Sequence, residues 1–77
     1  MENYLKFLQK LPINLRLKVI NYLEKIVKND LKNLDIKALK GTNIFYRCRV
    51  GKIRIIFEKK EEVNIIYDIG FRGDIYK

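Results

Sequence analysis

The amino-terminal part of the chain carries apolar residues three and four positions apart, which is the spacing of one face of an α-helix. A first short helix is predicted around the apolar positions Tyr4, Phe7, Leu8 and Leu11. Pro12 suits the first turn of a second helix, because a first turn leaves its backbone N–H groups unpaired and proline has none. The apolar stripe of this second helix consists of Ile13, Leu17, Ile20, Leu23 and Val27, widened by Val19 and Ile26. We expect a helical hairpin whose stripe packs on a sheet; a membrane-surface helix is the alternative.

The carboxy-terminal part alternates apolar and polar residues, which is the period of a half-buried β-strand. Strands are predicted at about 44–50, 53–59 and 63–71. Gly51-Lys52 is expected to be a two-residue hairpin turn, and residues 30–43 a linker that ends in a turn at 40–43. No repeat or domain boundary is evident, so residues 1–77 are predicted to form a single domain. Its fold class is α+β, with an amino-terminal helical hairpin packed on a small antiparallel β-sheet of about three strands.

The predicted hairpin determines which side chains share a face of the sheet, because neighbouring strand residues point to opposite faces. A turn at Gly51-Lys52 sets Arg49 opposite Arg54. One face of the hairpin is then uncharged, and the other carries Phe45, Arg47, Arg49, Arg54, Ile56 and Glu58. Like charges directly opposite each other destabilise a strand pair, so a fold that accepts this pair is expected to use it on an anionic ligand.

The third predicted strand extends this arrangement. Its alternation places on the apolar face Val63, Ile65, Tyr67, Ile69 and Phe71. Pairing of Phe57 with Ile65 makes the apolar faces of the second and third strands match. In that register Asp68 lies opposite Arg54, and Arg72 joins the arginine face.

The chain is strongly basic, with 17 Lys and Arg against 9 Asp and Glu, a net charge of +8 and a sequence pI near 9.8. A pI in this range suggests a nucleic-acid partner, but basic proteins without such a partner are common. Net charge alone therefore does not decide between a nucleic-acid-binding protein and a basic protein without such a partner. Its distribution is more informative, because residues 44–57 hold four basic groups and no acidic one.

The residues that are missing exclude several kinds of chemistry. Histidine is absent, which removes the commonest general base and the commonest metal ligand, so we expect no metal and no cofactor. Cys48 is the single cysteine, so no internal disulfide can form, and a small core residue in a reducing compartment is the favoured interpretation. As a nucleophile it would lack a histidine to activate it. No apolar run reaches transmembrane length, and we expect a cytoplasmic protein without a membrane partner.

The arginines supply the strongest candidate chemistry, in a patch formed by Arg47, Arg49, Arg54 and Arg72. Guanidinium groups suit phosphate oxygens and stay protonated, and an aromatic beside them, here Phe45, can stack a base. Fixed cations can also stabilise charge developing on phosphorus while the 2′-hydroxyl of RNA attacks it. Tyr76 is a candidate for orienting groups or exchanging a proton. The alternatives are a solvated polar face for the arginines and a core-edge position for Tyr76.

Three ordered segments resemble the RelE/ParE superfamily of toxins from type II toxin–antitoxin systems, and the RelE branch most of all. They are Leu39-Lys40-Gly41, then Tyr46-Arg47-Cys48-Arg49-Val50-Gly51-Lys52-Ile53-Arg54-Ile55-Ile56-Phe57, then Ile69-Gly70-Phe71-Arg72-Gly73-Asp74-Ile75-Tyr76. The helical hairpin with Lys10-Leu11-Pro12 at its bend is also similar, so the resemblance covers nearly the whole chain from Tyr4 onward. It implies a metal-independent endoribonuclease that cleaves messenger RNA in the ribosomal A site.

The resemblance also implies roles for individual residues. The catalytic positions of the family fall on Arg47, Arg49, Arg54, Arg72 and Tyr76, where they bind the scissile phosphate and share proton transfer. Residues expected to bind RNA are Phe45, Arg47, Arg49, Lys52, Arg54 and Arg72. Well-known RelE toxins have lysines at the first two of the catalytic positions, one of them a candidate general base, whereas arginine cannot usefully give up a proton. The base could instead be Tyr76, Lys52, a water or a ribosomal RNA group.

The resemblance extends to topology and partners. The family opens with a strand before its helices, and Met1-Glu2-Asn3 is too short to supply one, so the sheet is expected to have an exposed edge. The implied partner is an acidic antitoxin that wraps the helices or adds to the sheet edge, with the complex binding operator DNA through the antitoxin. Two other functions remain open: a ParE-like inhibitor of DNA gyrase, and a degenerate toxin that binds RNA without cleaving it.

Overall fold

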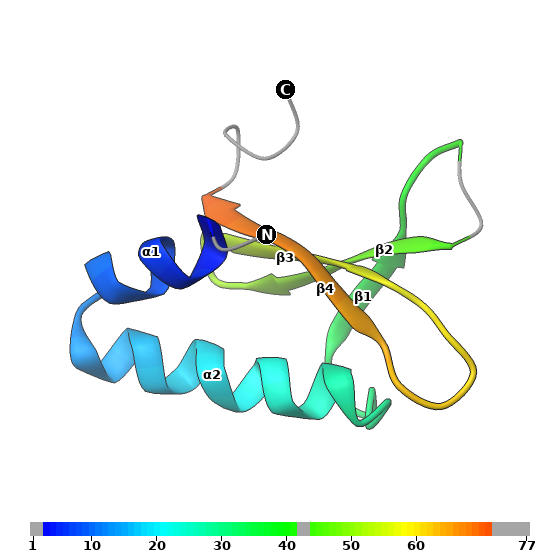
Figure 1. Ribbon diagram of the computed structural model, residues 1–77, viewed down its shortest axis with the longest axis horizontal. Coiled ribbons are helices and arrows are strands. Elements are labelled where there is room, and N and C mark those ends of the chain that lie inside the picture. Colours follow the sequence, from blue (N-terminus) through cyan, green and yellow to red (C-terminus); the bar gives the residue numbers. More distant parts are fainter. Residues whose placement is uncertain (1–2, 42–43, 72–77) are drawn as a thin grey trace.

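The protein is described by a computed structural model at residues 3–41 and 44–71. Two helices, α1 (Asn3–Lys10) and α2 (Ile13–Val27), cover one face of an antiparallel sheet (Figure 1). The strands are β1 (Asp35–Ala38), β2 (Phe45–Val50), β3 (Ile53–Glu58) and β4 (Ile65–Phe71), in the order β1-β2-β3-β4. This arrangement confirms the α+β class and the packing of the helical hairpin on the sheet. Within the described ranges, no helix is long and apolar enough to cross a membrane.

The sheet has four strands, and the first of them lies inside the predicted linker at 30–43. Within β1 the side chain of Ile36 is half-buried and the other three are exposed, so a single apolar position is too little for an alternating pattern to show. What makes this segment a strand is its backbone pairing with β2, which sets Ile36 opposite Cys48. The predicted count of about three strands was therefore one too low.

The β2–β3 hairpin has the predicted register, with Arg49 opposite Arg54, Arg47 opposite Ile56 and Val50 opposite Ile53. Gly51 begins the turn with a φ of 61°, in the left-handed region that glycine adopts at no steric cost. The turn and the alternation therefore agree on one register, and the uncharged face of the hairpin lies against the helices.

The predicted register of β4 was wrong along the strand: by two residues in its second half, which leaves each side chain on its predicted face, and by one residue in its first half, which does not. Phe57 pairs with Ile66 and not Ile65, and Arg54 lies opposite Gly70 and not Asp68. The two halves differ because a bulge interrupts the ladder beside Ile56 and Phe57. As a result Ile66 is buried, whereas Val63, Ile65 and Tyr67 are exposed. The prediction placed these three side chains on the apolar face, which was wrong because the strand is shifted there by one residue and each side chain points to the opposite face.

The physical cause of the bulge lies at Asn64, which is 2% exposed. Its side-chain amide donates to the carbonyl of Ile26 at 2.9 Å, and its backbone N–H donates to the carbonyl of Val27 at 3.2 Å. These bonds tie the start of β4 to the carboxyl end of α2 and turn Asn64 inward. Ile69 also points inward, toward Ile55. Strict alternation would place Asn64 and Ile69 on opposite faces, because they are an odd number of positions apart. The bulge adds one unpaired residue between them, so both can point inward.

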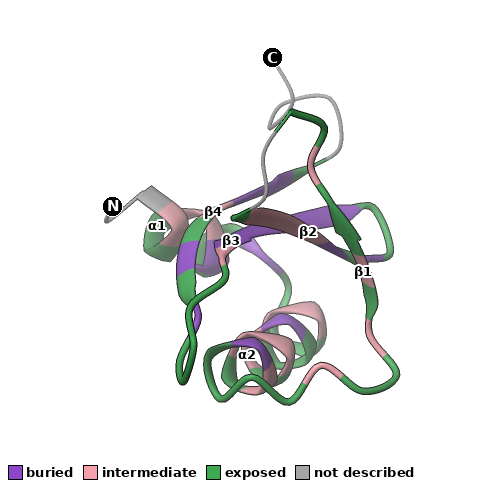
Figure 2. Cartoon of the chain, turned by 90° about the vertical axis from the view of Figure 1, so that its right-hand side faces the viewer, coloured by how far each residue is buried: buried purple, intermediate pink, exposed green. Residues whose placement is uncertain are grey.

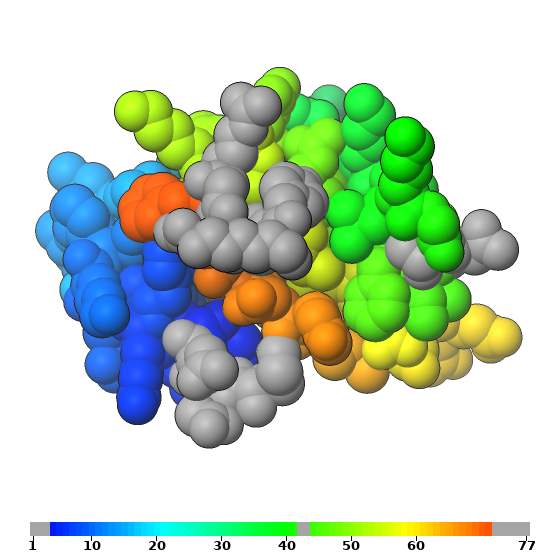
Figure 3. All heavy atoms as spheres, turned by 90° about the horizontal axis from the view of Figure 1, so that it is seen from above, coloured from blue at the N-terminus to red at the C-terminus, as the bar shows by residue number. Residues whose placement is uncertain are grey.

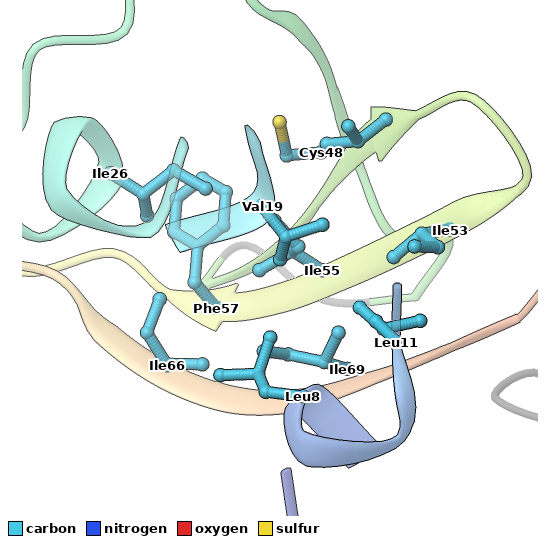
Figure 4. Close-up of a cluster of buried hydrophobic side chains, with 11 residues drawn as sticks. Leu8, Leu11, Val19, Ile26, Cys48, Ile53, Ile55, Phe57, Ile66 and Ile69 are labelled. Carbon is cyan, nitrogen blue, oxygen red and sulfur yellow. The ribbon is translucent and has the colours of Figure 1, made fainter. Parts of the chain in front are cut away.

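The core lies between the helices and the sheet (Figure 4). Its fully buried large side chains are Phe57, Ile26, Ile53, Ile55, Val19 and Cys48. On α2 the buried positions are Val19 and Ile26, which had been placed at the margin of the stripe, while Ile13 and Leu17 are each 57% exposed. In Figure 2 the buried part of α2 faces the sheet. The helix is thus rotated relative to its predicted stripe, and part of that stripe remains at the surface.

Candidate nucleic-acid interface

The face of the sheet away from the helices, called the outer face here, collects basic side chains from three strands. Arg47 and Arg49 come from β2, Arg54 from β3 and Lys37 from β1, where it lies opposite Arg47. Figure 3 views the molecule from the side away from α2, which is the side of this outer face. The predicted grouping of Arg47, Arg49 and Arg54 on one face is confirmed by the register, and β1 adds Lys37 to it.

Arg49 is held by an acidic residue from the neighbouring strand. Its Nε donates to Oδ2 of Asp35 at 2.7 Å, and the two side chains are 53% and 46% exposed. Asp35 lies directly across from Arg49 in the ladder, so it partly neutralises the positive charge that faces Arg54. The repulsion inferred from sequence is therefore reduced by a strand that the sequence did not reveal.

Arg54 is buried, with 7% of its surface exposed. Its Nη1 lies 3.1 Å from the carbonyl oxygen of Gly51 and 3.4 Å from that of Ile53. These contacts hold the guanidinium against the hairpin turn. A buried cation interacts with an anion more strongly than an exposed one, because less water screens the pair.

Three of the predicted site residues line one hollow at the turn end of the hairpin. This hairpin-end hollow has a volume of about 400 Å³ and is lined by Arg49, Gly51, Lys52, Arg54 and Phe71. Binding sites for small ligands typically measure about 300–1,000 Å³, so the hollow is large enough for one nucleotide unit. The arrangement places three cations around a single opening, which suits the oxygens of a phosphate.

The other predicted site residues do not line this hollow. Arg47 is half-buried further along β2, beside Lys37. Phe45 stands at the far end of β2, in a T-shaped contact with Tyr67 at a centroid distance of 5.1 Å. Arg72 and Tyr76 lie outside the described residues, so their predicted positions remain predictions.

Sequence reasoning missed three residues of this interface and misplaced Tyr67, which does not line the hairpin-end hollow. Asp35 and Lys37 were hidden in the supposed linker, and Tyr67 was assigned to the apolar face because the bulge was not foreseen. Phe71 was predicted on the apolar face, where its pairing with the core residue Ile53 places it, but the sequence did not show that it is 41% exposed and lines the hollow. In the sequence the edge strand is marked by no more than the polar–apolar–polar triplet Asp35-Ile36-Lys37, which is too short to distinguish a strand from a linker.

Cys48 lies on the opposite side of β2 from the arginines and is fully buried. Burial raises the pKa of its thiol from 9.0 to about 11, with a further contribution from the charge of Asp35, while Arg47 opposes the shift. A thiol with so high a pKa is protonated at neutral pH and is a poor nucleophile. The structure thus agrees with the interpretation of Cys48 as a core residue.

A second opening lies on the helical side of the molecule. This helix groove has a volume of about 270 Å³ and is lined by Tyr4, Ile20, Leu23, Glu24, Val27, Lys28 and Ile66. Its walls are mainly apolar, in contrast to the hairpin-end hollow. It exists because α2 presents Val19 and Ile26 to the sheet, which leaves Ile20 and Leu23 at the side.

Comparison with known proteins decides the family. No protein-family model matches the chain. The chain is 34% identical to the toxin RelE3 of Methanocaldococcus jannaschii, in an alignment that covers 97% of this chain and 89% of the relative. The chain belongs to the RelE toxin family. The resemblance seen in the sequence is thereby confirmed.

The fold of this RelE-family chain also matches a solved structure. The match is to the crystal structure of a RelB–RelE antitoxin–toxin complex from Methanococcus jannaschii, with a TM-score of 0.75 and 30% sequence identity. It covers 99% of this chain and 92% of the matched one. The helical hairpin on a four-stranded sheet is therefore the RelE-like α+β fold.

Proposed function

We propose that this RelE-family toxin is a ribosome-dependent endoribonuclease that cleaves messenger RNA in the A site. The observation that carries the proposal is the convergence of Arg49, Lys52 and Arg54 on one hollow. Positive groups fixed on a rigid hairpin need no reorganisation when charge develops on a phosphate, which is the basis of electrostatic catalysis. Membership in the RelE family supports the same activity.

The proposed reaction needs no redox partner. The 2′-oxygen of one nucleotide forms a bond to the adjacent phosphorus, and the bond from phosphorus to the 5′-oxygen of the next nucleotide breaks. The products are a 2′,3′-cyclic phosphate and a 5′-hydroxyl, with one proton leaving the 2′-hydroxyl and one reaching the 5′-oxygen. Arg49 and Arg54 would stabilise the negative charge on the non-bridging oxygens of phosphorus.

The proton acceptor is a separate question, because arginine stays protonated. Lys52 lines the hollow and is the candidate base within the described residues. Tyr76, a water and a group of ribosomal RNA are the other candidates. Replacement of Lys52 by arginine keeps the positive charge and removes a group able to accept the proton, so a large loss of cleavage would select Lys52.

We also propose an acidic antitoxin as partner of this chain, as in the RelB–RelE complex to which the fold is similar. Its amphipathic segment would place apolar residues in the helix groove, whose walls include Ile20, Leu23 and Val27. The net charge of +8 favours an acidic partner by complementarity. The toxin would act in the cytoplasm, and the complex would bind operator DNA through the antitoxin.

The test is primer extension on a messenger RNA held in programmed ribosomes, with the wild-type chain and Arg54→Ala. We expect a cut in the A-site codon and a loss of about 10²- to 10³-fold in its rate in the variant, the usual effect of removing one fixed donor to a developing oxyanion. Lys18→Ala, which removes an exposed cation of α2, is the matched control and should retain full activity. Circular dichroism confirms that each variant folds.

Other outcomes lead to the other functions. Full cleavage by Arg54→Ala would contradict the assigned site. No cleavage by the folded wild-type chain, together with salt-dependent RNA binding, would indicate a toxin that binds RNA without cutting it. No cleavage together with inhibition of DNA supercoiling at low protein concentration would indicate a ParE-like gyrase inhibitor.

A further inference from the structure

The hairpin-end hollow has one aromatic wall. Phe71 ends β4, lines the hollow beside Arg49 and Arg54, and is 41% exposed. Neither composition nor the arrangement of the cations requires an aromatic residue there. Several large apolar side chains are exposed in the described residues, and Phe71 differs from the others in lining a hollow together with cations.

Phe71 is held firmly in place. It pairs with Ile53, which is 1% exposed and belongs to the core, so Phe71 lies on the helix side of the sheet and meets the arginines of the outer face at the end of the hairpin. On its other side the ring of Phe7, from α1, meets it in a T-shaped contact with a centroid distance of 5.1 Å and an interplanar angle of 71°. In Figure 3 the orange-red end of β4 lies beside the blue α1. The ring is therefore supported by both the sheet and a helix, and part of its surface remains open.

We infer that Phe71 is a stacking platform for one nucleobase of bound RNA, at the hollow where Arg49, Lys52 and Arg54 hold the neighbouring phosphate. This inference rests on the proposed function and assigns the base subsite of the same hollow. Single-stranded RNA is bound by combining cations along its backbone with aromatic rings under its bases. The hollow supplies both within one opening, as it must if base and phosphate belong to the same nucleotide.

The chain contains a matched control for this role. Tyr67 is on the same strand, is 51% exposed and also makes a T-shaped aromatic contact, with Phe45. It does not line the hairpin-end hollow. A general contribution of exposed aromatic side chains to RNA binding or folding should therefore appear in Tyr67→Leu and Phe71→Leu alike, and stacking in the hollow should appear in Phe71→Leu alone.

The experiment measures the affinity of a fluorescent single-stranded RNA oligonucleotide by anisotropy. The probes are the intact oligonucleotide and a set in which one position at a time is abasic. We expect Phe71→Leu to weaken binding of the intact RNA on the order of tenfold, the typical contribution of one stacked base. Phe71→Tyr should retain the affinity, because it keeps the ring, and Tyr67→Leu should match the wild type.

The abasic set separates stacking from a structural effect. For the wild-type protein, one abasic position should weaken binding by a similar factor, and at that position Phe71→Leu should cause no further loss. Equal losses for Phe71→Leu on every probe, or the same loss in Tyr67→Leu, would overturn the inference. The inference would also be overturned if the wild-type protein bound every abasic probe as tightly as the intact RNA. This second test uses only the wild-type protein, so it does not depend on whether a variant folds.

Failure of the inference can be told apart from failure of the proposed function. Ribosomal cleavage by the wild type with no effect of Phe71→Leu on binding or cleavage would refute the platform and leave the nuclease intact. If the folded wild type neither cleaved messenger RNA nor bound the oligonucleotide, the proposed function itself would fail, and the base subsite with it.

Discussion

The hairpin-end hollow and the helix groove are two openings on opposite layers of the same small domain, and their linings differ in kind. The hollow is formed by three cations and one ring on the sheet, whereas the groove is formed mainly by aliphatic side chains between α1, α2 and β4. Cationic groups on a rigid hairpin suit an anionic ligand, because they are held at fixed positions where they can bind its charged oxygens. An apolar groove suits a polypeptide segment that buries its own apolar side chains.

The two openings also differ in how their residues are held. Arg54 is fixed by hydrogen bonds to the turn carbonyls, and Arg49 by the Asp35 carboxylate. The apolar side chains of Ile20 and Leu23 in the groove are instead held by packing, at the edge of a core to which they contribute part of their surface. Under the proposed function, RNA and antitoxin would contact different residues, and variants can separate the two kinds of binding.

Among the variants that test the difference between the two openings, the largest effect is expected on antitoxin binding. Leu23→Ala removes apolar surface from the groove and should weaken the complex with the acidic antitoxin more than tenfold, as truncation of a central interface residue commonly does. Leu17→Ala, on the same helix but outside the groove and 57% exposed, should leave the affinity unchanged. Titration calorimetry measures both, and ribosomal cleavage should persist in each. Equal weakening by the two variants would mean that the groove is not the binding site.

A pH dependence tests the core that separates the two openings. Burial raises the pKa of the Cys48 thiol to about 11, so between pH 9 and 11 the unfolded chain loses this proton while the folded chain keeps it. Stability should therefore fall as pH rises through this window, by about 1.4 kcal/mol per pH unit, and be unaffected by this group below pH 9. Urea unfolding of the wild type and Cys48→Ala measures the difference. Parallel pH curves for the two proteins would contradict the burial of the thiol.

The smallest expected effect concerns the charge balance of the outer face. Asp35→Asn breaks an exposed ion pair, so the stability should drop by less than about 1 kcal/mol. Arg49 is then released, and RNA affinity should rise with a steeper dependence on salt concentration. Asp30→Asn removes the same charge from an exposed residue after α2 and is the control. A rise of equal size in both variants would show a general charge effect and no specific role for Asp35.

The β2–β3 hairpin was predictable because two local signals agreed. Gly51 favours a tight turn, and strict alternation on both sides of it permits a single register that buries one face. Arg47, Arg49 and Arg54 could therefore be assigned to one face of the sheet from sequence. The catalytic roles that the family resemblance implies for these arginines, and for Arg72 and Tyr76, stay predictions.

The parts that were not predictable depend on contacts between distant segments. β1 has one inward apolar residue and becomes a strand by pairing with β2. The bulge in β4 follows from the bonds of Asn64 to the end of α2, 38 residues away in the chain. The rotation of α2 depends on which of its apolar residues fit against Ile55 and Phe57. None of these contacts leaves a periodic signal in its own segment.

The sequence by itself determined the α+β class, the hairpin register and the basic face, because each follows from local periodicity and turn chemistry. The tertiary structure alone decided that Asp35 meets Arg49, that Arg54 is buried, and that Phe71 joins Lys52 at one hollow. Local preferences specify which way a side chain points within its own element. Which side chains then share an opening depends on long-range pairing and packing, whose free energy is distributed over the whole core.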